Sequence, residues 1–331
     1  MNIRERTEAI EESFMSPFAA LSTNTKGRDI PEEECELRTP YQRDRDRILH
    51  CKAFRRLKHK TQMFLSPEGD HYRTRLTHTL EVSQIARTLA RALLLNEDLT
   101  EAISLGHDLG HTPFGHAGER ALNQLYPDGF CHYEQSVRVV EILEKNGKGL
   151  NLTKEVRDGI LCHTKGTEAT TLEGRIVRLA DRIAYINHDV DDAVRAGVLL
   201  EGDIPKDITS VLGLHRTQRI DTVVKSVVEN SQNGTIRMSP EIQCAFDKLH
   251  DFMFEAVYLN PYAKAEEKKV PQLIGTLYEY LNKPENFPHD MGYIAESDGL
   301  ERAVCDYIAG MTDHFAIQLF QEIYVPKSWN I

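Results

Sequence analysis

The sequence predicts an all-α protein. Apolar residues recur at helical spacing through most of the chain, and one such stripe consists of Leu80, Val82, Ile85, Ala86, Leu89 and Leu93. Alternation of apolar and polar residues, which is the pattern of a half-buried strand, is scarce. The chain has 331 residues, of which 40% are apolar and 27% charged, so it is long enough for one large domain or two closely packed ones.

The N-terminal part is predicted to change character near residue 40. Residues 1–40 are expected to be an irregular arm, and a helix is expected from Tyr41. Its apolar stripe consists of Ile48, Leu49, Ala53, Phe54 and Leu57. Its basic side chains form either an outer face in water or a group that points inward at an anion; they are Arg55, Arg56, Lys58 and Lys60.

Further helices are expected along the rest of the chain. They span about Asp98–Leu105, Glu134–Leu143 and Thr153–Cys162, and a longer one begins near Leu172. The Gly202–Pro205 segment indicates a boundary, after which the chain again has a helical pattern. We therefore expect an arm at 1–40, a core at 41–200, and a C-terminal helical region at 201–331 that packs on the core.

Composition restricts the class of protein. The formal net charge is −11, which argues against a broad nucleic-acid-binding surface, because such surfaces are normally basic. The N-terminus is charged, and no run of residues approaches the length of a membrane span. The six cysteines are widely spaced and contain no Cys-x-x-Cys pair, so we expect reduced thiols in a cytoplasmic protein.

The stretch His107–Glu119 has the most informative composition in the chain. It holds three histidines and two carboxylates, and it is interrupted by Gly110, Pro113, Gly115 and Gly118. A helix interior would not be built in this way, because glycine costs about 1 kcal/mol there and proline about 3 kcal/mol. The alternative is a polar turn with incidental histidines. The pattern favours a metal site followed by a loop of acid and base groups.

Four side chains form the predicted metal site. His107 and Asp108 are adjacent, His78 comes from the preceding helix, and Asp181 interrupts the apolar face of a later one. Imidazole and carboxylate ligands suit one divalent cation such as Mg²⁺, Mn²⁺ or Fe²⁺, and this number of ligands leaves positions open for catalysis. His163 is expected to have a structural or substrate-side role, with ligation of a second ion as the alternative.

Seven segments carry a resemblance to a known family: Gln42–Arg47, Ala53–Gln62, Thr74–His78, His107–Glu119, Leu172–Gly174, Ala180–Tyr185 and Ala309–Asp313. They are similar to the HD superfamily of metal-dependent phosphohydrolases and, within it, to the deoxyguanosine triphosphate triphosphohydrolase-like family. The resemblance covers the chain from about Thr39 to Trp329. It implies an HD-domain helical core with an additional C-terminal helical region.

The resemblance implies an activity as well. Such enzymes hydrolyse a deoxynucleoside triphosphate, dGTP or another, to deoxynucleoside and inorganic triphosphate, by attack of water on the α-phosphorus. His116 and Glu119 are three residues apart and would face the same way on a helix, so we expect this pair to transfer protons. His111 would contact phosphate or assist the acid, and His132 matches a family position near the phosphates.

The remaining predicted site residues concern the substrate. Arg75 and Arg182 are candidates for the triphosphate, because its negative charges require cationic side chains. By resemblance, Tyr185 would lie against the deoxyribose, Asp189 would accept the 3′-hydroxyl, and Gln62 would reach the sugar.

Two alternatives stay open at this stage. The chain could be another HD phosphohydrolase, a nucleotidase or phosphodiesterase, or a catalytically silent regulator that binds nucleotides or single-stranded nucleic acid. The resemblance further implies a homo-oligomer, a tetramer or hexamer, with an allosteric nucleotide in some members. No base preference is visible in the residues.

Overall fold

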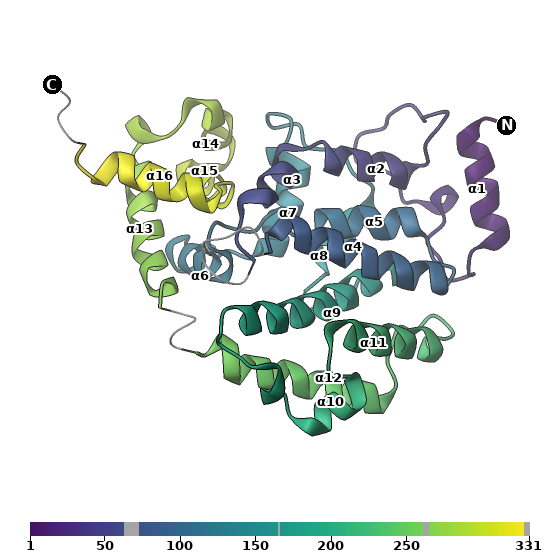
Figure 1. Ribbon diagram of the computed structural model, residues 1–331. Coiled ribbons are helices and arrows are strands. Elements are labelled where there is room, and N and C mark those ends of the chain that lie inside the picture. Colours follow the sequence, from purple (N-terminus) through teal and green to yellow (C-terminus); the bar gives the residue numbers. More distant parts are fainter. Residues whose placement is uncertain (63–72, 165, 261–264, 328–331) are drawn as a thin grey trace. The chain divides into compact units, whose positions relative to one another are not determined.

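The described part of the chain folds into helices joined by loops of different lengths (Figure 1). The computed structural model describes residues 1–62, 73–164, 166–260 and 265–327. In these ranges there is no β-strand, and the β-type pairing consists of an isolated bridge between Thr61 and Thr74. The all-α fold class is therefore confirmed. None of the described helices is both long and apolar enough to cross a membrane.

The first 40 residues are not wholly irregular, which corrects the expectation for this segment. Helix α1 (Ile3–Phe14) begins after Asn2, whose side chain accepts a hydrogen bond from the amide of Glu5. The Glu5 carboxylate in turn accepts from the amide of Asn2, which completes a capping box. The Asn2–Glu5 spacing is itself a helix-start signal, so α1 could have been predicted. Between α1 and Pro40 the chain forms one short 3₁₀ turn at Ser22–Asn24.

Contacts group the chain into two compact units, each assembled from three separate segments. Unit 1 comprises Met1–His50, Thr77–His107 and Leu150–Lys264. Unit 2 comprises Cys51–Leu76, Asp108–Gly149 and Ala265–Ile331. These boundaries differ from the division expected at residues 40 and 200, because each unit collects segments that are distant in the sequence. The proposed packing of 201–331 on a core stays a prediction.

Unit 1 is built around helices α5 and α9. Its helices are α1, α2 (Pro40–Leu49), α4 (Arg75–Ala92, whose first two residues group with unit 2), α5 (Glu97–Gly106), α8 (Lys154–Leu161), α9 (Leu172–Arg195), α10 (Lys206–Leu212), α11 (Arg216–Asn230) and α12 (Pro240–Met253). Helix α5 packs against α2, α8 and α9. The α5–α8 approach is close enough that a Cβ at Gly106 would lie 2.5 Å from Cδ1 of Ile160. This packing fixes the end of α5, which leads directly into His107, relative to α9, which carries Asp181.

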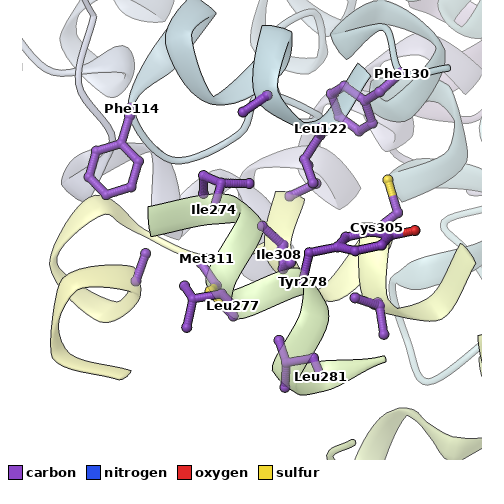
Figure 2. Close-up of a cluster of buried hydrophobic side chains, with 14 of the residues drawn as sticks. Phe114, Leu122, Phe130, Ile274, Leu277, Tyr278, Leu281, Cys305, Ile308 and Met311 are labelled. Carbon is purple, nitrogen blue, oxygen red and sulfur yellow. The ribbon is translucent and has the colours of Figure 1, made fainter. Parts of the chain in front are cut away.

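Unit 2 has its own apolar core (Figure 2). Its helices are α3 (Lys52–Arg56), α6 (Gly115–Leu125), α7 (His132–Arg138), α13 (Val270–Leu281), α14 (Gly292–Asp298), α15 (Leu300–Ala309) and α16 (Asp313–Tyr324). Helix α6 packs on α13, so that Leu122 meets a cluster that includes Ile274, Leu277 and Ile308. Phe114, just before α6, belongs to the same cluster. The start of α6 is therefore held by the C-terminal helices.

Candidate functional site

Unit 1 brings three of the predicted metal ligands together. The carboxylate oxygen Oδ1 of Asp181 lies 3.0 Å from Nε2 of His78 and 3.8 Å from Nε2 of His107. Both histidines are buried, whereas the Asp181 side chain is 20% exposed. Two imidazole nitrogens and a carboxylate at these separations form a donor set that could hold a divalent cation.

The ring orientation of His107 suits a metal ligand. Its Nδ1 lies 2.6 Å from the carbonyl oxygen of Ser104, one turn back on α5. A carbonyl oxygen can only accept, so Nδ1 carries a proton, and Nε2 is the ring nitrogen on the side of Asp181. A backbone carbonyl that fixes the tautomer in this way is the common partner of a metal-bound histidine. The residues present therefore fit a bound divalent metal.

Asp108 follows His107 directly in the chain and belongs to unit 2. Oδ2 of Asp108 pairs with Nη1 of Arg75 at 2.9 Å, and Oδ1 lies 3.2 Å from Nε2 of His111. Arg75, predicted as a phosphate-binding residue, is only 2% exposed. The structure thus gives Arg75 a carboxylate partner, and it places Asp108 between a guanidinium and an imidazole.

The predicted acid–base residues form a connected group in unit 2. Oε2 of Glu119 lies 3.1 Å from Nδ1 of His116, as the spacing of three residues on α6 predicts. The other oxygen, Oε1, lies 2.7 Å from Nδ1 of His132 and accepts the backbone N–H of the same residue at 2.9 Å. The His132 ring stacks on His111 with the centroids 3.9 Å apart. One carboxylate therefore orients two imidazoles.

The protonation of this group follows from burial and hydrogen bonding. Burial by itself would raise the pKa of the Glu119 carboxyl, but the hydrogen bonds with His116 and His132 outweigh it and lower this pKa below its ordinary range. Burial lowers the pKa of His111 well below its ordinary value, and the nearby positive charge of Arg75 adds to this effect. At neutral pH, Glu119 is therefore ionised and His111 is neutral. His116 has the most exposed of these side chains, at 68%.

Three predicted substrate residues lie on α9 in unit 1. Arg182 pairs with Asp247 of α12 at 2.7 Å. Tyr185 is half-buried, and burial together with the nearby Asp181 carboxylate raises the pKa of its hydroxyl to about 12, so this hydroxyl stays protonated. Asp189 is buried and accepts a hydrogen bond from the hydroxyl of Tyr258, which residue spacing did not indicate.

Gln62 lies near the edge of the described residues of unit 2. Its Oε1 is buried and makes no hydrogen bond within the described part of the chain. Beside it, Thr61 donates through both its amide and its hydroxyl to the carboxylate of Asp313. Lys60 is 2% exposed and donates to the backbone oxygens of His111 and Ala309. Of the two alternatives for the basic segment, Lys60 does point inward, although at carbonyl oxygens rather than at an anion.

Family models match two parts of the chain. Residues 75–186 match the HD domain, and residues 236–322 match a phosphohydrolase-associated domain. These matches, with the His/Asp group of unit 1, indicate a metal-dependent phosphohydrolase of the HD class.

Close relatives narrow the class to one family. The chain is 56% identical to a deoxyguanosinetriphosphate triphosphohydrolase-like protein of Caldanaerobacter subterraneus subsp. tengcongensis, over 99% of this chain and 98% of the relative. It is 49% identical to one of Clostridium tetani, over 99% and 97%, and 50% identical to one of Clostridium perfringens strain 13, over 99% of each. The chain belongs to the deoxyguanosinetriphosphate triphosphohydrolase-like family.

Proposed function

We propose that this protein hydrolyses deoxynucleoside triphosphates to deoxynucleoside and inorganic triphosphate, with water attacking the α-phosphorus. The observation that carries the proposal is the Glu119 carboxylate that orients His116 and His132, with neutral His111 stacked on His132. This chemistry needs one group to take a proton from water and another to protonate the leaving 5′-oxygen. Such a set of adjacent imidazoles can do both.

The metal-binding role falls to His78, His107, Asp108 and Asp181. When bound, a divalent cation such as Mg²⁺, Mn²⁺ or Fe²⁺ would supply positive charge against the phosphate oxygens and acidify water. The Ser104 carbonyl holds Nδ1 of His107, so Nε2 is the ring nitrogen that would ligate the cation. Asp181 would supply a carboxylate ligand beside the imidazole nitrogen of His78.

Proton transfer is assigned to His116, with Glu119 holding its ring. Because Nδ1 of His116 faces the carboxylate, its Nε2 is the atom that exchanges a proton with water or with the 5′-oxygen. Ionised Glu119 stabilises the imidazolium that forms when His116 takes a proton. His111, kept neutral by burial, would donate or accept a hydrogen bond at phosphate or assist the acid, and His132 would lie near the phosphates.

Substrate recognition is assigned to the remaining residues. Arg182 and Arg75 would neutralise phosphate charge, and each would exchange part of its present carboxylate pairing for phosphate. The protonated hydroxyl and ring of Tyr185 would lie against the deoxyribose and exclude a 2′-hydroxyl. Asp189 would accept the 3′-hydroxyl, and Gln62 would reach the sugar through its amide.

The direct test is a product analysis with purified protein. Each deoxynucleoside triphosphate is supplied singly and in mixture, with Mg²⁺ or Mn²⁺, and the products are separated by anion-exchange chromatography. We expect deoxynucleoside and inorganic triphosphate in equal amounts. Release of orthophosphate instead would favour another HD phosphohydrolase activity. Nucleotide or single-stranded DNA binding without turnover would favour a regulatory protein.

Assembly and location are part of the same proposal. We expect a cytoplasmic homo-oligomer, a tetramer or hexamer, and an activating nucleotide would raise the rate when substrates are mixed. Light scattering on the purified protein measures the mass, and comparison of single with mixed nucleotides tests the activation.

A further inference from the structure

The loop that precedes α6 has a conformation that its own sequence does not favour. Phe114, the residue before the helix, has φ of 63° and ψ of 24°, which is left-handed backbone. A bulky residue other than glycine is uncommon in this region and remains there only when its surroundings hold it. Two residues later comes His116, so the direction of the first turn of α6 depends on how Phe114 is held.

Hydrogen bonds from other parts of unit 2 hold both ends of this loop. At one end, Nζ of Lys60 donates to the carbonyl oxygen of His111 and, at 2.8 Å, to that of Ala309 at the end of α15. At the other end, Oδ1 of Asp313 accepts the backbone N–H of Phe114 at 2.9 Å. Since Lys60 and Asp313 are both buried, these bonds are shielded from water.

The Asp313 carboxylate also binds the segment that carries Lys60. Its second oxygen, Oδ2, accepts the amide of Thr61 at 3.0 Å and the Thr61 hydroxyl. Asp313 is the first residue of α16, where the orientation of the helix dipole favours a negative charge. One side chain from the C-terminal part of the chain therefore joins the Lys60–Thr61 segment to the amide of Phe114.

The side chain of Phe114 adds an apolar attachment to the same helices. It is 5% exposed and belongs to the core cluster with Ile274 of α13 and Met311, which lies between α15 and α16 (Figure 2). Its amide and its ring are thus both fixed by the C-terminal helices. This double attachment accounts for the persistence of left-handed backbone at a phenylalanine.

We propose that Asp313 is a positioning residue for the phosphohydrolase reaction, which holds Phe114 in left-handed backbone so that His111, His116 and Glu119 keep their mutual geometry. The inference rests on the proposed function for its kinetic consequence. It assigns a role in activity to the phosphohydrolase-associated region, in which Asp313 lies. Asp313 itself touches no reacting atom and acts through the backbone of the loop.

The test replaces Asp313 by asparagine, which keeps the shape of the side chain but removes its charge and one acceptor. The new NH₂ group must face either the Phe114 amide or the Thr61 donors, so at least one hydrogen bond is lost. We expect kcat to fall by about tenfold or more, while KM and the affinity for Mn²⁺ stay within about threefold. Glu322→Gln is the matched control, because Glu322 lies on the same helix and is exposed.

A second variant and a second measurement keep the test decisive. Thr61→Val removes only the hydroxyl donor to Asp313, and we expect a smaller loss of kcat in a protein that still folds. Histidine side-chain NMR of the folded Asp313→Asn protein should show shifted ring signals for His111 and His132, because their stacking depends on the loop. Asp313→Glu, which restores the charge, should recover part of both changes.

The outcomes separate this inference from the proposed function. If the wild-type protein hydrolyses no deoxynucleoside triphosphate, the proposed function fails, and the NMR comparison still decides whether Asp313 positions the loop. Unchanged kcat and unchanged histidine signals in Asp313→Asn would overturn the inference. If kcat fell equally in Asp313→Asn and in the control Glu322→Gln, the inference would be overturned as well.

Discussion

Gly118, in the first turn of α6, has no room for a side chain. A Cβ at this position would lie 2.0 Å from the carbonyl oxygen of Pro113 and 2.8 Å from Oγ1 of Thr112. Ordinary contacts of a Cβ begin near 3.4 Å, so Gly118→Ala forces the helix and the preceding loop apart by roughly 1.4 Å. Glu119 is the next residue, and its carboxylate must move with the helix.

Gly118→Ala is expected to lower both the stability of the protein and its catalytic rate. Overpacking of this kind destabilises a protein by about 1–3 kcal/mol, so the unfolding midpoint should fall in urea or on heating. Displacement of a catalytic group by about 1 Å typically lowers the rate by about 10²-fold. Since the Glu119–His132 contact is 2.7 Å long, the shift is large enough to break it. We therefore expect a large fall in kcat at temperatures where the variant is still folded.

Gly275→Ala provides the matched control. Gly275 lies inside α13 of the same unit, and a Cβ there meets nothing within 4 Å. Alanine should stabilise the helix by up to about 1 kcal/mol and leave kcat unchanged. Triphosphate release and thermal unfolding are measured for both variants. Wild-type kcat and stability in Gly118→Ala would refute the assigned geometry of the loop and α6.

Further predictions concern three separate groups. His116→Ala should lower kcat by about 10²–10⁴-fold while Mn²⁺ binding persists, and an unchanged rate would remove His116 from the mechanism. Asp181→Asn should lower the metal content after dialysis and abolish the rise in unfolding temperature on addition of Mn²⁺; retained binding would contradict its role as a ligand. Hydrogen bonds from the backbone N–H of Leu37, and then from the amide and guanidinium of Arg38, lower the pKa of the Cys35 thiol to about 7. Its alkylation by iodoacetamide should therefore rise through about pH 7, and this midpoint should move to higher pH in Arg38→Met, since the thiolate is the reactive form.

Local pattern was enough to predict the features that depend on nearby residues. The helical spacing of apolar residues predicted the all-α fold, and the spacing of His116 and Glu119 predicted that their side chains would meet on α6. The adjacency of His107 and Asp108 predicted metal ligands at the end of α5. Each of these signals is contained within a few turns of one segment.

Features that depend on distant contacts could not be predicted in the same way. Asp313 is 199 positions away from Phe114, whose amide it binds, and no local pattern relates the two. Lys60 is one basic residue among several, and only the tertiary structure shows that it points inward. The bond from Tyr258 to Asp189 joins residues 69 positions apart. Helix α1 is different, because its capping signal at Asn2 and Glu5 was present in the sequence.

The position of bond cleavage is settled most directly by hydrolysis in H₂¹⁸O. The purified protein is incubated with a deoxynucleoside triphosphate and Mn²⁺, and the products are analysed by mass spectrometry. Attack of water on the α-phosphorus with loss of the 5′-oxygen places one ¹⁸O in inorganic triphosphate and none in the deoxynucleoside, and Asp108→Ala should release neither product. Recovery of ¹⁸O in a deoxynucleoside monophosphate, in orthophosphate or in the deoxynucleoside itself would contradict the proposed reaction.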